Sequence, residues 1–313
     1  MNDMTKYFNI WIVWMMLSWT VSAQQIPIST MFVENPFAFN PAVAGTGNGF
    51  KLRMNNRMQW VGFGDAPVTT HLSYFGPHQV RPIGYGGNLN YDKTGSVSVL
   101  KMNGAFAYNF AVDFDMRVSL GLNLGLVQYR VDGTQFEYYD PTVIDLYAPP
   151  AVMANFRPDA GAGIYVYHHD WYAGISAQQL FNNTLKLTDV GENNKLSKLK
   201  PHLYGFAGYR FADGVMQNLI IEPAILLRSV AGTPFHMDIS GRVIYKQQFW
   251  GGLCIRNSFE KFEDISIMVG YIHERRITIA LAYDYTLLKI GNYTAGTFEL
   301  VLGYNFDEIR RGR

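Results

Sequence analysis

The sequence predicts an all-β protein, a transmembrane antiparallel β-barrel of about 14 strands that follows an irregular N-terminal segment. Three observations support this fold class. Many segments alternate between large apolar and polar residues, and the composition is rich in aromatic residues but poor in charge. In addition, the connections between segments alternate between tight turns and longer loops.

The alternation is clearest near the C-terminus, where one face of residues 297–306 is large and apolar. Successive strand residues point to opposite faces, so this segment has an apolar and a polar side. A charge facing lipid near midplane costs about 2–4 kcal/mol, so charged faces are predicted to line the lumen. The first strand places Lys51, Arg53, Asn55, Arg57 and Gln59 on such a face. Across all strands the lumen charges are of both signs, which favours a packed, ion-paired interior over an open pore. The expected lumen charges are Arg53, Arg57, Arg117, Arg228, Arg242 and Arg256, with Glu222, Asp238, Asp284 and Glu299.

The composition suits a bilayer better than a soluble surface. Hydrophobic residues make up 48% of the chain and aromatic residues 15%, whereas only 16% are charged, below the quarter or so that is usual for soluble domains. After residue 23 no apolar run reaches the roughly 18 residues that a membrane helix needs. The single cysteine, Cys254, excludes an internal disulfide, so stability must come from a large core or from lipid. A net charge of +1 gives no electrostatic case for nucleic acid.

The N-terminus predicts export. Residues 1–23 are typical of a secretory signal peptide, with Lys6, an apolar stretch and small residues at Val21-Ser22-Ala23; the alternative is an N-terminal membrane anchor. Residues 24–48 do not alternate, and Asn35-Pro36 and Asn40-Pro41 are turn initiators. This irregular segment or plug is expected either inside the lumen or at the periplasmic mouth. A barrel at 49–306 and a periplasmic tail at 307–313 complete the predicted organisation.

The predicted strands lie near 49–60, 67–76, 82–92, 97–111, 116–130, 158–168, 171–179, 202–211, 218–230, 235–246, 249–257, 265–273, 276–286 and 296–306. Tight turns join even-numbered strands to the next, whereas the long connections, near 131–157 and 180–201, follow odd-numbered strands. Outer-membrane barrels have short periplasmic turns and longer external loops. The even count therefore puts both termini in the periplasm, and the bacterial cell outer membrane is the predicted location. A bulge or bend is expected at Pro223, because proline cannot donate a ladder hydrogen bond.

No motif predicts catalysis, a cofactor or a metal. The sequence has no Gly-x-Ser-x-Gly elbow, no His-Glu-x-x-His and no phosphate-binding Gly-x-x-x-x-Gly-Lys. His168 and His169 are adjacent on a strand end and would face opposite ways, which favours an unliganded turn over a metal site. The protein is therefore predicted not to be an enzyme.

Three groups of residues occur in a specific order: Asn35-Pro36 through Asn40-Pro41-Ala42-Val43-Ala44-Gly45, then Asn56-Arg57-Met58-Gln59-Trp60, and then Tyr283-Asp284-Tyr285 followed by Gly296-Thr297-Phe298-Glu299. In these residues the chain resembles the PorP/SprF family of Bacteroidota outer-membrane proteins. One departure is Phe298, where the family often has histidine. Because Phe298 is predicted to face lipid, this change should leave the lumen as it is.

The resemblance implies a non-catalytic component of the type IX secretion and gliding machinery. Its implied partners are outer-membrane lipid, periplasmic secretion or motor components, and the C-terminal domain of a secreted surface protein. By position, the family pattern assigns seven residues to shaping the plug and lumen: Asn40, Pro41, Arg57, Gln59, Trp60, Asp284 and Glu299. The alternative function is a channel or transporter for a small solute. Aromatic residues in the long loops, Phe136, Tyr138, Tyr139 and Tyr147, would provide external protein-binding surface.

Overall fold

The computed structural model describes residues 29–133, 152–181, 183–185, 197–198, 200–212, 218–231, 233–258 and 261–306. The predicted signal peptide, the loop aromatics from Phe136 to Tyr147 and the tail at 307–313 lie outside these residues. Among the described residues, no helix is long and apolar enough to cross a bilayer.

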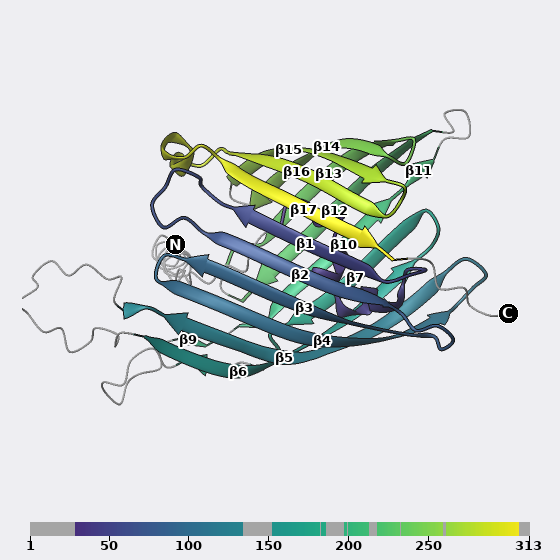
Figure 1. Ribbon diagram of the computed structural model, residues 1–313, viewed down its shortest axis with the longest axis horizontal. Coiled ribbons are helices and arrows are strands. Elements are labelled where there is room, and N and C mark those ends of the chain that lie inside the picture. The colour runs from purple at the N-terminus through teal and green to yellow at the C-terminus, as the bar shows by residue number, and fades with distance from the viewer. Residues whose placement is uncertain are drawn as a thin grey trace, which may run out of the picture.

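Fourteen antiparallel strands form a closed β-barrel (Figure 1). Each pairs with its neighbours in chain order, and the pairings of β1 with β17 and of β10 with β12 complete the closure. The strands are β1 (Lys51–Met58), β2 (Val68–Pro77), β3 (Ile83–Thr94), β4 (Val97–Ala111), β5 (Arg117–Val131), β6 (Met153–Tyr167), β7 (Trp171–Gln178), β10 (His202–Tyr209), β12 (Leu219–Val230), β13 (His236–Tyr245), β14 (Phe249–Ser258), β15 (Lys261–His273), β16 (Ile277–Thr286) and β17 (Thr297–Asn305).

Among the described residues, three short strands lie outside this set, and a 3-10 helix lies in the last connection. The strand β11 (Phe211–Ala212) continues the pairing of β10 along β12, and β8 (Thr184–Leu185) pairs with β9 (Ser197–Lys198) in the connection between β7 and β10. The 3-10 helix η4 (Lys289–Tyr293) belongs to the connection between β16 and β17.

The two faces of the barrel separate as the alternation predicts. In β16 the outward residues Ile277, Ile279 and Leu281 are exposed, whereas Thr278, Ala280, Ala282 and Asp284 between them are buried. Phe298 also points outward. The predicted lumen charges are largely inaccessible, including Arg256, Glu222, Asp284 and Glu299, each exposed by no more than 2%. The bulky outer residues are thus left for lipid to cover.

An aromatic belt surrounds the end of the barrel at which β1 begins and β17 ends. Phe50 stacks on Tyr74 with ring centroids 5.0 Å apart, and Tyr74 meets Phe306 edge-on at 5.8 Å. Further pairs follow around the wall: Tyr108 with Phe110, Tyr209 with Phe211, and Phe249 with Tyr271. Aromatic girdles of this kind mark the membrane–water interfaces of outer-membrane barrels.

All fourteen predicted strands are confirmed, with two errors at strand ends. β6 begins at Met153 rather than 158, and β15 begins at Lys261 rather than 265. Of the bulge or bend expected at Pro223, the bulge is wrong. β12 pairs with β10 after Pro223, at Gly208↔Ala224, and with β11 before it, at Phe211↔Ile221. Both pairs belong to the same register, so no extra residue is inserted at Pro223. The missing N–H instead interrupts the ladder opposite Tyr209, where β10 ends.

Of the described residues before β1, residues 29–45 are mostly buried and lie inside the barrel, where they are drawn in purple (Figure 1). We call residues 29–50 the N-terminal segment. It contains two 3-10 helices, η1 (Pro36–Ala38) and η2 (Pro41–Gly45), each with asparagine at its N-cap and proline at its first position. That order is favoured because proline's fixed φ suits the first helical residue, whose N–H needs no partner.

Candidate functional site

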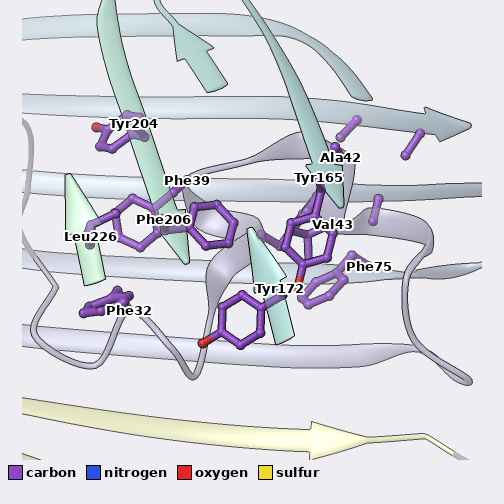
Figure 2. Close-up of a cluster of buried hydrophobic side chains, with 14 of the residues drawn as sticks. Phe32, Phe39, Ala42, Val43, Phe75, Tyr165, Tyr172, Tyr204, Phe206 and Leu226 are labelled. Carbon is purple, nitrogen blue, oxygen red and sulfur yellow. The ribbon is translucent and has the colours of Figure 1, made fainter. Parts of the chain in front are cut away.

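The lumen is filled by the N-terminal segment. Phe32, Phe37 and Phe39 are each exposed by 7% or less. Figure 2 shows the segment's side chains among aromatic residues that point inward from the wall. The wall residues of this cluster are Phe75, Ala105, Ala107, Tyr165, Tyr172, Tyr204, Phe206, Ala224 and Leu226. They come from β2 and β4 and from the consecutive strands β6, β7, β10 and β12, so the segment joins separate parts of the wall.

Glycines in the wall let the backbone of the segment approach closely. A Cβ at Gly121 would overlap the backbone of Pro41 and Ala42, and one at Gly84 would overlap Ala44 and Gly45. Gly163 likewise leaves room for the Asn40 side chain. The wall is therefore shaped to the segment, and any larger residue at these positions would displace it.

Asn40 attaches η2 to the wall. Its Oδ1 accepts from the Ala42 N–H at 2.9 Å, and its Nδ2 donates to the carbonyls of Ile164 and Ile175 at 2.9 and 3.1 Å. One fully buried side chain thus caps the helix and bridges β6 and β7. Pro41, the next residue, is the first residue of η2.

A buried ion-pair network holds the start of the segment. Arg57 Nη1 lies 2.7 Å from Asp284 Oδ2 and 3.2 Å from Glu299 Oε2, so β1, β16 and β17 meet at one point. Arg256 extends the network to Asp238 at 3.0 Å and Asp264 at 2.6 Å. Buried charges are tolerated only when paired in this way, because an isolated one would bear its full desolvation cost.

Thr30 lies at the centre of this network. Its hydroxyl donates to Asp284 at 2.8 Å and accepts from Arg57 and Arg256, each at 3.1 Å. Its N–H donates to Glu299 Oε2 at 2.8 Å, and the Ser29 hydroxyl donates to Glu299 Oε1 at 2.6 Å. The network therefore binds the segment as well as closing the barrel.

A second ion-pair cluster lies farther along the lumen. Arg242 pairs with Glu34 of the segment and, through Nη2 at 2.7 Å, with Glu222 of β12. Arg210 completes the cluster, with Nε 3.2 Å from Glu222. Glu34 is the sole charged residue between Gln24 and Asn48, which singles it out as a partner for a lumen arginine.

Five of the seven residues assigned by the family pattern therefore contact the segment or belong to it: Asn40, Pro41, Arg57, Asp284 and Glu299. Gln59 and Trp60 lie elsewhere, beyond the end of β1. The Gln59 N–H donates to the Pro67 carbonyl, and the Trp60 N–H donates to Thr297 Oγ1. Sequence reasoning missed Ser29 and Thr30, because no local pattern distinguishes a small hydroxyl residue that meets partners about 250 positions away.

A polar cavity of about 90 Å³ remains between the segment and the wall, which is room for a few water molecules. Asn35, Asn55, Asn88, Asn90, Asn103 and Asn123 are among its lining residues. No group of three or more potential metal ligands is found in the part of the chain that the structure describes. The arrangement thus provides a lumen that is filled and cross-linked by the N-terminal segment.

A family model described as "Type IX secretion system membrane protein PorP/SprF" matches residues 21–304. Among solved structures, the chain is similar to a CymD monoaromatic hydrocarbon channel, at 11% identity and a TM-score of 0.54 over 91% of this chain and 95% of that one. It is also similar to a Pseudomonas aeruginosa FadL homologue, at 10% identity and a TM-score of 0.50 over 91% and 96%. These likenesses show the barrel fold alone. No match was found among curated proteins.

Proposed function

Because the chain belongs to the PorP/SprF family of type IX secretion system membrane proteins, we propose that it is a non-catalytic scaffold of that machinery in the outer membrane. In this role it couples periplasmic components to the cell surface and anchors a secreted surface protein. The observation that carries the proposal is the lumen, which the N-terminal segment fills through apolar packing and buried ion pairs. A filled lumen suits a rigid connector more than a conduit.

The alternative is a channel for a small solute, which the similarity to the CymD monoaromatic hydrocarbon channel favours. Conduction would require the N-terminal segment to leave its place. That movement would separate Glu34 from Arg242 and take Thr30 from the carboxylates of Asp284 and Glu299. It would also expose three buried phenylalanines, each stabilised by about 1.5–3 kcal/mol through burial. The scaffold is therefore the better-supported function.

The test is affinity purification of the tagged protein from its native outer membrane after mild detergent extraction. Recovery of periplasmic secretion-ring components or a large surface protein is expected. Recovery of lipopolysaccharide and unrelated porins alone would contradict the scaffold. In parallel, liposomes that contain the purified barrel should swell little in small sugars, and rapid swelling would support the channel.

A further inference from the structure

Two neighbouring hairpin turns have an unusual backbone for their residues. The turn between β13 and β14 has Lys246 and Gln247 at φ of 52° and 56°, and the turn between β15 and β16 has Glu274 and Arg275 at 49° and 59°. Both turns are closed by an i→i+3 hydrogen bond, from Gln248 N–H to the Tyr245 carbonyl and from Arg276 N–H to the His273 carbonyl. They are thus two-residue turns of type I′.

Type I′ turns strongly favour Asn-Gly, because both central residues need a positive φ. Long side chains there are strained, and these two turns have a long side chain at all four central positions. Within the hairpins the compensation is small. Lys246 Nζ lies 5.3 Å from the Tyr245 ring, and Glu274 lies 3.9 Å from the exposed His273. The same turns could be built from Asn-Gly without this strain, so the long side chains indicate a role other than folding.

The two turns line one groove. A hollow of about 450 Å³ lies between them and the start of β12, and its lining residues are Asn218, Ile220, Lys246, Gln247, Gln248, Glu274 and Arg275. The backbone fixes its walls. The Lys246 N–H donates to the Asn218 carbonyl at 2.7 Å, and the Ile272 N–H donates to the Gln248 carbonyl at 2.6 Å. The polar side chains of the lining are exposed, so the groove is open to the aqueous phase.

The groove lies at the end of the barrel where β17 finishes, since Asn305 donates to the carbonyls of Arg275 and Arg276. This end carries the short turns, which face the periplasm in outer-membrane barrels. The lining offers two cations, one carboxylate and three amides. A lipid phosphate would favour clustered cations without a carboxylate beside them. Mixed charge with amides instead suits a peptide, whose acidic side chains pair with Lys246 and Arg275 while its main chain bonds the amides.

We propose that this groove is the docking site for an acidic, extended segment of a periplasmic protein. The inference rests on the proposed function, because it identifies where that scaffold would meet a periplasmic partner. On this proposal, the long turn side chains strain the backbone but provide the contacts to the docked segment. Restoring the residues that the backbone favours should therefore stabilise the barrel and weaken docking, a combination that a purely structural role does not predict.

The decisive variant combines Lys246→Asn, Gln247→Gly, Glu274→Asn and Arg275→Gly in the full-length protein. Its unfolding midpoint in vesicles should equal or exceed that of the wild type. A photo-crosslinkable residue at Gln247 of the otherwise unchanged protein, in its native membrane, should capture a periplasmic protein. Purification of the tagged variant should recover that protein at a level reduced about tenfold or more, as expected for lost charged contacts. The matched control is Asp113→Asn with Phe114→Gly, at an exposed turn of the same end, which should leave recovery unchanged.

Undiminished recovery with the fourfold variant, or crosslinking from position 247 to lipid alone, would overturn the docking site. A fourfold variant that is less stable than the wild type would overturn the argument from strain. These outcomes are distinct from failure of the proposed function. If the wild-type protein recovers secretion components and the variant recovers them equally, only the groove is rejected. If the wild type recovers none, the scaffold itself is rejected.

Discussion

Glu299→Ala is the sharpest test of how the N-terminal segment is held. The carboxylate accepts hydrogen bonds from the Ser29 hydroxyl at 2.6 Å and from the N–H groups of Thr30 and Met31 at 2.8 and 3.4 Å. It also pairs with Arg57 at 3.2 Å. The substitution removes all four contacts but leaves the Arg57–Asp284 pair in place.

The expected loss of unfolding free energy follows from those contacts. Removing one partner of a buried ion pair costs about 3–5 kcal/mol, because the other charge is left without compensation. Arg57 keeps Asp284 at 2.7 Å, which places the expected loss at the lower end, about 3 kcal/mol. Glu299→Gln retains an acceptor for the segment and should lose only about 1–2 kcal/mol, the value of a few weakened hydrogen bonds.

Equilibrium unfolding in guanidinium chloride, with the barrel in lipid vesicles, measures both losses. Glu263→Ala is the control, because Glu263 pairs with His236 of the wall at 3.3 Å. It should cost less than about 1 kcal/mol, as partly exposed ion pairs do. Cys254 provides a local readout, since it is fully buried in a cluster with Met31 and Trp250. Maleimide labelling of Cys254 should accelerate in Glu299→Ala and stay slow in Glu263→Ala.

An unfolding free energy of Glu299→Ala within about 1 kcal/mol of the wild type, with unchanged labelling of Cys254, would refute the reasoning. That result would mean that the segment is retained by its phenylalanines, with the ion pairs serving only to close β1 on β17.

Three further predictions address the wall and the lipid face. Asn40→Ala should lower the unfolding free energy by about 2–3 kcal/mol, because it removes the η2 cap and two buried hydrogen bonds to the wall; guanidinium titration in vesicles measures it. Gly121→Val should prevent η2 from seating, which protease sensitivity of the N-terminal segment in an assembled barrel would reveal; a protected segment would contradict the close approach to Ala42. Leu253→Arg places a charge on the outer face near the middle of β14 and should cost about 2–4 kcal/mol in vesicles. A neutral effect there would argue against contact with lipid.

The sequence predicted the strands well because lipid imposes alternation on every one of them. The errors lie where that constraint ends. Asn155 and Arg157 in the first extension, and Lys261, Glu263 and Asp264 in the second, weaken the apolar alternation at these strand ends, and Pro158 interrupts it further. Backbone hydrogen bonds to β5 and β14 hold these extensions in the sheet. The residue pattern of one strand does not show how far its neighbour continues the pairing.

The lumen was predictable as a set of charges but not as a set of partners. Arg57, Asp284 and Glu299 were expected on the inner face, because charge is excluded from lipid. Their convergence on Thr30 arises from closure of β1 on β17 and from the position of the N-terminal segment. Neither of these leaves a local signal in the sequence. Asn40 precedes a proline and could therefore be predicted as a turn former. Its hydrogen bonds to β6 and β7 depend on the space left by Gly163 and Gly174, which the sequence does not reveal.

The glycines that face the N-terminal segment destabilise the wall strands, and packing of the segment offsets that cost. Gly84, Gly121, Gly163 and Gly174 each weaken a strand by about 0.5–1 kcal/mol relative to alanine, a total of about 2–4 kcal/mol. An empty barrel would gain nothing in return. With the segment in place, burial of Phe32, Phe37 and Phe39 at about 1.5–3 kcal/mol each offsets that cost. The wall is thus more stable with the N-terminal segment in place, as the proposed scaffold requires.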